Sequence, residues 1–517
     1  MRLAQPFASA YPRDMLSIHA EGALAPCPSP FNLAAHVLAA GRSDPDKIAL
    51  AILGPTGAER WYYGRLTQAV LGTASGLKAA GLVPGDRVLM RLGNTVEFPI
   101  AYLGAIAAGL VPVPTSSQLT EGEVARMVAV IDPALVLRAE EVACPPVAVP
   151  VIGVQELTRW RDLPATDYEM GDPDRLAYIV FTSGTSGRPQ AVAHAHRAIW
   201  ARQMMISDWY ALRSSDRLLH AGAFNWTYTL GTGLMDPWTM GATALIPAPG
   251  TQAAQIPLLL ARYDATIFAA APGVYRQILR HAVPPLPKLR HGLAAGEKLP
   301  AETRAAWLRA TGTEIHEAFG MSEVSTFISA SPERPCDPDC LGRPQRGRRV
   351  AILDETGAAV APGTPGIIAV HRDDPGLMLG YFGAPEATAA RFAGHWFLTG
   401  DQGVMRADGQ IAYLGRNDDM MNAGGFRVSP LEIEAALDGL PGLAEIAVTE
   451  VEVRPGVTVI GAFFTGTITA EALSEAAGDR LARYKQPRHW QKMEALPRNP
   501  NGKLSRKALR AALVPRP

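Results

Sequence analysis

The chain is poor in cysteine and has no excess of charge of either sign. Its 517 residues include four cysteines, too few and too scattered for a disulfide framework, so we expect a reducing compartment. The 49 lysines and arginines balance the 49 aspartates and glutamates, which gives a formal net charge of zero. A neutral chain has no overall field to hold a polyanion, and this argues against nucleic acid as the main partner, although a local basic patch could still exist.

A leader peptide and a membrane span are also not expected. Near the N-terminus, Pro6, Pro12, Arg13 and Asp14 interrupt any apolar core of a signal peptide, so we predict a cytoplasmic protein. The stretch 98–120 is uncharged and long enough to span a bilayer. Its prolines and glycines break it, however, and predict a buried helix, a turn and a strand.

Cys336 and Cys340 are the nearest approach to a metal motif. Zinc takes four ligands, and no second Cys/His pair lies nearby, so an exposed loop is the simpler interpretation.

The composition provides ample material for buried cores. Hydrophobic residues make up 48% and charged residues 19% of the chain, and this excludes wholesale disorder. At roughly 150 residues per domain, the length predicts about three to four folding units, or fewer if one is large.

From residue 174 the pattern alternates between short apolar runs and helix-compatible stretches. The run 176–182 has strand length and is followed by a Gly/Ser/Thr loop and then by a helix-compatible stretch from about residue 195. The same order recurs along the chain, in 242–246 with 253–262, in 265–269 with a helix opened by Pro272, and in 291–294 with 301–310. Repeated strand–helix units predict a mostly parallel sheet covered on both faces.

The pattern changes again towards the C-terminus. Short β-like pieces separated by glycine and proline predict a small β subdomain after about residue 345. Ser429, Pro430 and Glu432 provide the N-cap, the first-turn proline and the capping-box glutamate of a helix start. Two strand-like runs, 444–453 and 457–464, predict a hairpin. The end of the chain is therefore expected to be a separate α+β domain.

The strongest local signal for chemistry is the segment 182–190, Thr-Ser-Gly-Thr-Ser-Gly-Arg-Pro-Gln. Its glycines let several backbone N–H groups converge, its hydroxyls add donors, and Arg188 adds charge, which suits a polyphosphate. It is not the Walker loop, which needs a Gly-Lys-Ser/Thr ending. Such a turn alone is more often a flexible linker, but its position directly after a strand favours phosphate binding.

Other dense polar segments occur at predicted strand ends, and their order is informative. They are 296–298, 319–323, 397–401, 415–419 and 501–503. Each alone is usually a turn or a solvated loop. Taken together, they resemble the adenylate-forming superfamily, which includes acyl-CoA synthetases, amino-acid adenylation domains and firefly-type luciferases. The resemblance covers nearly the whole chain.

This resemblance implies an α/β fold with two domains. Residues 1–416 would form a large N-terminal domain of layered α/β subdomains plus a small β subdomain, and 417–517 a mobile α+β C-terminal lid. The implied reaction joins a carboxylic acid to ATP, giving acyl-AMP and pyrophosphate, and then transfers the acyl group to coenzyme A. ATP, Mg²⁺ and coenzyme A are thus the implied cofactors. A homodimer is compatible with the resemblance.

The resemblance also assigns roles around ATP. The residues that would wrap the β- and γ-phosphates are Thr182, Ser183, Gly184, Thr185, Ser186 and Gly187. Gly296 and Glu297 would line the adenine pocket, and Phe319 would stack on adenine. Gly320 and Ser322, from the same segment as Phe319, would also bind ATP or AMP. Glu323 would bind Mg²⁺ as a catalytic residue, since a carboxylate oxygen suits a hard ion. Asp401 would accept both ribose hydroxyls, and Arg416 would help to hold the ribose and the phosphate.

The remaining roles concern the C-terminal domain. Lys503 would be catalytic, reaching back to the α-phosphate and the attacking carboxylate. Asp418 would be the hinge about which the domain rotates between the two half-reactions. Gly424 and Gly425 would leave a tunnel for the pantetheine arm of coenzyme A, and Arg427 would meet its phosphate.

One position departs from the family pattern. The phosphate loop of the family ends in Pro-Lys-Gly or Pro-Lys-Ala, whereas here it reads Pro189-Gln190-Ala191. Arg188 could supply the missing charge. The alternative is a weakened enzyme or a nucleotide-binding pseudoenzyme.

The segment 224–230 indicates which kind of acid is the substrate. An amino-acid substrate would call for an Asp after Phe224, but Asn225 is neutral and argues against it. This segment and 235–238 resemble those of medium-chain and aromatic acyl-CoA synthetases. The acyl pocket would be lined by Phe224, Trp226 and Tyr228, with Ala294, Ala295 and Met321 at its floor, whereas Trp238 is more simply a core residue. We therefore predict an acid–CoA ligase for a short or medium-chain or aromatic acid; the alternative is an adenylating enzyme with another acceptor.

Overall fold

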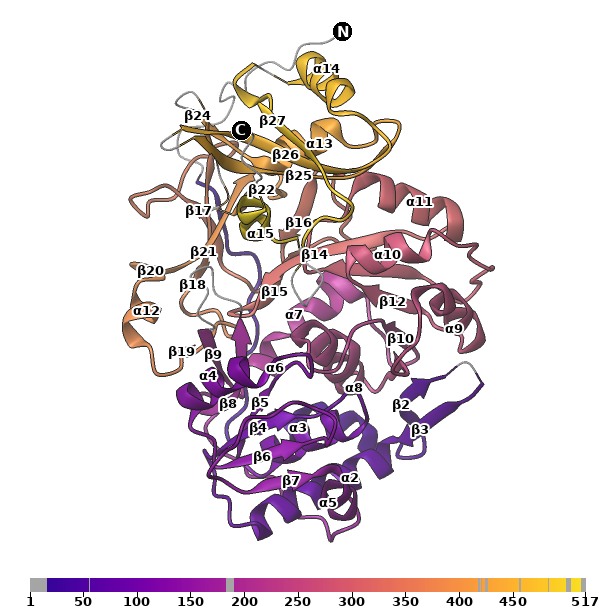
Figure 1. Ribbon diagram of the computed structural model, residues 1–517. Helices are drawn as coiled ribbons and strands as arrows, with labels where there is room; N and C mark the ends of the chain where they lie inside the picture. Colours follow the sequence, from indigo (N-terminus) through magenta and orange to yellow (C-terminus); the bar gives the residue numbers. More distant parts are fainter. Residues whose placement is uncertain are drawn as a thin grey trace. The chain divides into compact units, whose positions relative to one another are not determined.

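The structure is a computed structural model (Figure 1), which describes residues 16–54, 56–182, 190–416, 419, 421–423, 426–454, 457–481, 483–498 and 504–512. The chain folds into two compact units. The main unit comprises 20–349 and 371–395, and the C-terminal unit comprises the residues before 20 together with 350–370 and those from 396 onward. The domain boundary expected between 416 and 417 stays a prediction.

The largest sheet of the main unit has the strand order β16-β15-β14-β13-β12-β10-β11-β2-β3. The strands from β14 to β2 in this order run parallel, and antiparallel strands flank them on both sides. The bounds are β2 (Ile48–Leu53), β3 (Ala58–Tyr62), β10 (Arg217–His220), β11 (Thr243–Pro247), β12 (Ile267–Ala270), β13 (His291–Ala295), β14 (Ile315–Met321), β15 (Ser325–Ser329) and β16 (Cys340–Pro344). The mostly parallel sheet expected from the sequence is confirmed.

The strand–helix units form because their strands are apolar on both faces. All of β12 is buried, and successive side chains of β13 enter two different core clusters. The expected helices follow their strands as α9 (Ile256–Arg262), α10 (Pro272–Ile278) and α11 (Ala301–Thr311). Pro272 occupies the first position of α10, as predicted.

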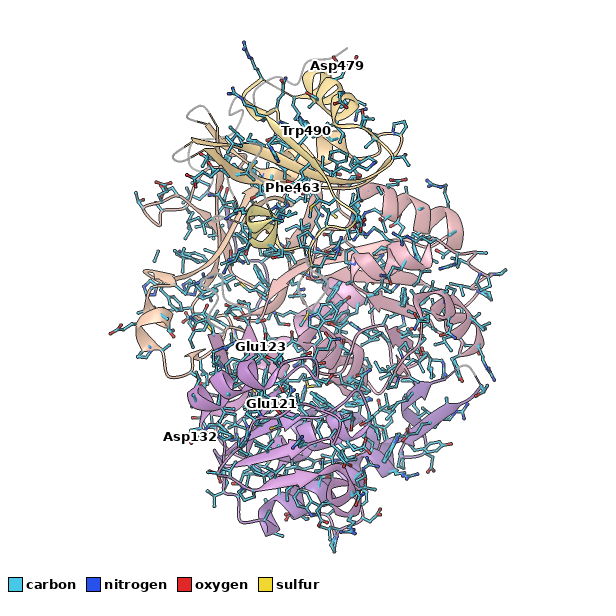
Figure 2. The ribbon with its side chains drawn as sticks, in the orientation of Figure 1. Glu121, Glu123, Asp132, Phe463, Asp479 and Trp490 are labelled. Carbon is cyan, nitrogen blue, oxygen red and sulfur yellow. The ribbon has the colours of Figure 1, made fainter. Side chains whose placement is uncertain are left out.

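A second, smaller sheet of the main unit has the order β5-β4-β6-β7 and is also parallel. Its strands and associated helices are β4 (Arg87–Arg91), β5 (Val111–Pro114), β6 (Leu135–Arg138), β7 (Val151–Gly153), α2 (Tyr63–Ala79), α3 (Glu97–Ala107), α4 (Glu121–Ile131) and α5 (Val154–Trp160). Glu121 and Glu123 begin α4 and Asp132 follows it (Figure 2), with Thr120 and Glu123 forming a capping box. The uncharged stretch 98–120 is the helix, turn and strand that we expected. In the part of the chain that the structure describes, every helix is too short or too polar to cross a bilayer.

The phosphate-loop segment corrects one expectation. It follows β8 (Leu176–Thr182) but leads into another strand, β9 (Gln190–Ala195), rather than into a helix. These strands pair antiparallel, and β19 (Gly380–Tyr381) pairs with the other edge of β9. Because β9 is flanked by two strands and buried, small residues such as Ala191 and Ala193 pack well there, although they resemble the start of a helix. The first helix after it is α6 (Ala198–Ala201).

The C-terminal unit contains the two expected β regions. The strands β1 (Ile18–His19), β17 (Val350–Leu353), β18 (Pro365–His371), β21 (Trp396–Met405) and β22 (Ile411–Arg416) form one sheet region. The predicted hairpin is confirmed as β25 (Leu443–Arg454) and β26 (Val457–Gly466), extended by β27 (His489–Lys492). The two faces of this sheet bury different hydrophobic clusters (Figure 2). On one face Phe463 packs in a cluster with α15 (Arg506–Ala511). On the other face Trp490 packs in a cluster with α13 (Pro430–Leu437) and α14 (Ala470–Arg480).

Two local expectations are wrong. Ser429 is the N-cap residue of α13, but its hydroxyl donates to the carbonyl oxygen of Leu414 instead of accepting from the helix, and Glu432 pairs with Lys485. The capping box is therefore not formed, because both side chains have tertiary partners. Cys340 does not lie in an exposed loop but is buried at the start of β16, where strand pairing encloses it.

Candidate active site

The carboxyl ends of two parallel strands bring together two segments of predicted site residues in the main unit. β13 ends at Ala295, directly before Gly296 and Glu297, and β14 ends directly before Ser322 and Glu323. These strands are neighbours and run parallel, so the two segments leave the same edge of the sheet. Ligands of open α/β sheets bind in a crevice at this edge. The structure therefore brings the adenine and metal segments together.

Glu323 is held in place by the short strand β19. Its side chain is buried, and the hydroxyl of Tyr381 donates to its Oε1 at 2.8 Å. Its backbone oxygen accepts the N–H of Met378, also at 2.8 Å. A carboxylate oxygen is a ligand that a hard cation such as Mg²⁺ prefers, and the hydroxyl of Tyr381 fixes the orientation of this one. Sequence reasoning missed Tyr381, which lies far from Glu323 in the chain.

Ser322 is connected to the phosphate-loop hairpin through His194. The Nε2–H of His194 donates to the backbone oxygen of Ser322 at 2.7 Å, and its ring stacks on Tyr178 at 4.9 Å. Burial lowers the pKa of His194 to about 4, so the ring is neutral near pH 7. His194 and Tyr178 belong to β9 and β8, the two strands that flank the predicted phosphate loop. The hairpin thus contacts the segment that carries Glu323.

The phosphate loop itself is described only at its ends. Thr182 closes β8, Gln190 opens β9, and the two residues are cross-strand partners. Ser183, Gly184, Thr185, Ser186 and Gly187 lie outside the described residues, as does Arg188. Their phosphate-binding role stays a prediction.

The adenine segments need glycine for geometric reasons. Gly296 has φ +100°, in the region that favours glycine, and a Cβ on Gly320 would lie 2.3 Å from the carbonyl oxygen of Ser325. Glu297 accepts the N–H of Gly273 at 3.2 Å near the start of α10. Phe319 lies beside an irregularity in the β14–β15 ladder. The local backbone therefore determines where each of these residues lies.

The predicted acyl residues are only partly brought together. Trp226 and Tyr228 meet edge to face at 5.1 Å and share a core cluster with Ala295. Ala294 belongs to the cluster on the opposite face, since neighbouring side chains of a strand alternate. Phe224 is fully buried in a third cluster, away from this pair. Met321 ends β14 at the same sheet edge, one strand away from Ala295.

The segment 235–238 has a supporting role. Asp236 is buried and accepts two hydrogen bonds from Arg202, at 2.8 and 2.6 Å, and one from the hydroxyl of Tyr210 at 2.7 Å. Trp238 is fully buried and donates to the carbonyl oxygen of Ala49, so its interpretation as a core residue is confirmed. This network anchors the π-helical turn Thr229–Met235, which directly follows Tyr228.

His220 is a further residue that sequence reasoning missed. It ends β10 at the same sheet edge, is fully buried, and lies edge to face with Tyr228 at 4.4 Å. Burial lowers its pKa to about 3. The only available signal was a histidine after two leucines, and such a residue is usually structural.

In the C-terminal unit, Asp401 and Arg416 are cross-strand partners on β21 and β22. The nearest nitrogen of Arg416 lies 4.0 Å from Asp401 Oδ2, and the hydroxyl of Tyr413 donates to Oδ1 at 2.8 Å. Asp401 is buried, and its backbone N–H donates to Thr399. These contacts fix the orientation of the Asp401 carboxylate. Tyr413 was not predicted.

The remaining candidates fall largely outside the part of the chain that the structure describes. Lys503, Asp418, Gly424 and Gly425 lie outside the described residues, and only the backbone of Arg427 is described, in β24 (Phe426–Val428). The helix that follows Lys503 is firmly anchored, however. Arg506 of α15 pairs with Glu434 at 2.6 Å and donates to the carbonyl oxygen of Val448 at 3.0 Å.

Among the described residues, no group of three or more His, Cys, Asp or Glu side chains is arranged to hold a metal ion. Mg²⁺ has different requirements, since it is commonly bound through one or two carboxylates together with substrate phosphates and water.

The sequence matches two family models. Residues 38–382 match the AMP-binding enzyme family, and 432–503 match the AMP-binding enzyme C-terminal domain. A 3-hydroxybenzoate–CoA/4-hydroxybenzoate–CoA ligase of Thauera aromatica is 32% identical over 484 residues, which cover 87% of this chain and 92% of the relative.

Solved structures agree with this match. A benzoate CoA ligase from Burkholderia xenovorans LB400 superimposes with a TM-score of 0.83 at 28% identity, covering 93% of this chain and 100% of the other. ATP-bound MatB from Rhodopseudomonas palustris superimposes with a TM-score of 0.84 at 26% identity, covering 93% and 99%. The fold class expected from the sequence, a large α/β domain with a small C-terminal domain, is confirmed.

Proposed function

Because the chain belongs to the AMP-binding enzyme family, we propose that it is an AMP-forming acid–CoA ligase whose acid is aromatic. The observation that carries this proposal is that Trp226 and Tyr228 share a cluster at the sheet edge from which the Glu323 segment emerges. A flat acid bound against these rings would present its carboxylate towards the nucleotide. The relatives that act on benzoate and hydroxybenzoates support an aromatic acid over an aliphatic one.

The reaction has two steps with different demands. In the first, a carboxylate oxygen attacks the α-phosphorus of ATP, and pyrophosphate leaves. In the second, the thiol sulfur of coenzyme A attacks the acyl carbon, and AMP leaves with the bonding electrons. Both steps bring anions together, so catalysis depends on placing the reactants and on neutralising the charge that develops. Coenzyme A supplies its own thiol, and no catalytic cysteine is required.

Different segments described above would bind the phosphates, the base and the ribose of ATP. The loop that begins at Thr182 would bind the β- and γ-phosphates through backbone N–H groups. Gly296 leaves room for a flat base close to the backbone, and Phe319 provides an aromatic face for it. Asp401 would accept hydrogen bonds from the ribose hydroxyls. Lys503, a compact and mobile cation, would serve the first step only.

Mg²⁺ would be held by Glu323. The site offers one buried carboxylate, oriented by Tyr381, and this donor set fits an ion whose other ligands are phosphate oxygens and water. When bound, the ion would neutralise charge on the leaving pyrophosphate. The described residues contribute the fixed orientation of the carboxylate.

Gln190 keeps a second candidate function open. It opens β9, next to the phosphate loop, at a position where the family pattern has a lysine. A protein that binds ATP without reacting would be a nucleotide-binding pseudoenzyme. The cytoplasmic location and the homodimer also stay predictions.

The test is a measurement of pyrophosphate release over a panel of short, medium-chain, branched, aromatic and amino acids, each with and without coenzyme A. We expect aromatic acids to be the most active and to yield acyl-CoA. Acyl-AMP without thioester would indicate another acceptor. ATP binding without pyrophosphate from any acid would support the pseudoenzyme, and a preference for aliphatic acids would contradict the aromatic pocket.

A further inference from the structure

His220 brings a buried hydrogen-bond donor to the predicted acyl pocket. Its Nδ1 accepts the backbone N–H of Gly222 at 3.0 Å, and the hydroxyl oxygen of Thr229 lies 3.2 Å from the same nitrogen. A backbone N–H can only donate, so Nδ1 must carry a lone pair. Burial keeps the ring neutral, and the single ring proton is therefore assigned to Nε2.

This Nε2–H has no hydrogen-bond partner among the described residues, although His220 is fully buried. Buried donors in native proteins are nearly always paired, and an exception calls for a bound water, a ligand or another acceptor. The ring of Tyr228, 4.4 Å away and edge to face, is the nearest alternative. An N–H···ring contact is weaker than an ordinary hydrogen bond. The donor is thus under-satisfied.

The imidazole ring of His220 lies close to the backbone of Gly222. A Cβ on Gly222 would lie 2.2 Å from the hydroxyl oxygen of Thr229 and 3.0 Å from both Cε1 of His220 and Cε3 of Trp226. These side chains can converge only because the glycine has none. Cε1 is bonded directly to Nε2, and both Gly222 and Trp226 are only partly buried. For a ligand group to reach the buried donor, the side chain of Trp226 would have to move.

The side chains around the donor determine whether the acceptor that binds it can be charged. Trp226, Tyr228 and Ala295 belong to one apolar cluster, and Leu218, two residues before His220 on β10, belongs to it as well. Burying a charged group here without a countercharge would be very costly. A neutral donor in apolar surroundings suits an uncharged acceptor, such as the oxygen of a phenolic hydroxyl.

We propose that His220 is a specificity-determining residue of the acyl pocket, whose Nε2–H binds an uncharged oxygen acceptor on the ring of an aromatic acid. This inference rests on the proposed acid–CoA ligase function. A pocket built to bind a hydroxyl rejects the analogue without it, because the donor is then left unpaired. The penalty for leaving a buried donor unpaired predicts a preference of about 10- to 100-fold in kcat/KM.

The experiment compares hydroxybenzoates with methylbenzoates. The hydroxyl and methyl groups have similar sizes, and each pair is tested at the ortho, meta and para positions. We expect one hydroxybenzoate to exceed its methyl partner by about 10- to 100-fold in kcat/KM for acyl-CoA formation. The ratio within a pair is the readout, because a general defect would lower both acids alike.

Two variants assign the preference to the ring nitrogen. H220N keeps an acceptor near the position of Nδ1 for Gly222 but removes the distal donor. H220Q places an amide donor near the position of Nε2. We expect the hydroxyl-to-methyl ratio to fall to about 1 in H220N and to recover at least in part in H220Q.

The outcomes separate the inference from the function on which it rests. Equal use of hydroxyl and methyl partners at every position by the wild-type protein would overturn the role of His220, even if neither variant folds. An unchanged ratio in H220N would also overturn it. If no acid gives acyl-CoA in the wild type, the proposed function itself fails, and this inference fails with it.

Discussion

Arg202→Met should destabilise the main unit strongly, because it leaves a buried carboxylate without its countercharge. Arg202 makes two hydrogen bonds to Asp236, and the Asp236 side chain is 2% exposed. Removing one partner of a buried ion pair costs about 3–5 kcal/mol. An unfolding entropy of about 2.1 cal/mol/K per residue, over roughly 350 residues, converts this loss into a fall in Tm of about 4–7 °C.

The assay is thermal unfolding followed by circular dichroism, with two comparison variants. R202M/D236N removes both charges, so we expect it to lose less stability than R202M alone. Arg159→Met is the matched control, because Arg159 pairs with Glu156 on the surface with 75% of its side chain exposed, and its loss should stay within about 0.5 kcal/mol. Equal melting temperatures for R202M and R159M, or a double variant less stable than R202M, would refute the reasoning.

Other predictions concern the reaction. Lys503→Ala should cost at least ~3 kcal/mol in the adenylation barrier while sparing thioester formation from supplied acyl-AMP, and equal loss in both half-reactions would reject its assigned role. Gly425→Leu should block thioester formation but leave pyrophosphate release, so the tunnel assignment fails if both persist. Trp226→Ala should shift the preference towards bulkier acids in a kcat/KM profile, and an unchanged profile would remove Trp226 from the pocket. Gln190→Lys should raise pyrophosphate release or leave it unchanged, whereas a large loss would reveal a role of Gln190 itself.

The sequence predicted the α/β core well because its signals are local. Strands such as β12 and β13 are short apolar runs, and the helices after them begin at recognisable positions such as Pro272. The hairpin of β25 and β26 has an equally local signal. By contrast, β9 alternates alanines with Gln190, Val192 and His194, a weak strand signal, and its pairing with β8 and β19 makes it a strand.

The candidate site shows the same difference between local signals and long-range contacts. Segments such as 296–297 and 322–323 follow strands directly, so parallel pairing brings them to one edge. The supporting contacts could not be predicted, because Tyr381 and His194 reach Glu323 and Ser322 from distant parts of the chain. The alternation of a strand also separates Ala294 from Ala295, a distinction that the resemblance alone did not make.

The most direct test of the central claim is a competition experiment. The protein is incubated with ATP, Mg²⁺, coenzyme A and an equimolar mixture of benzoate, hydroxybenzoates and medium-chain fatty acids, and the thioesters are measured by mass spectrometry. An aromatic acyl-CoA should accumulate first, with AMP formed in equal amount. Accumulation of an aliphatic acyl-CoA, or the absence of any thioester while ATP is bound, would contradict the account.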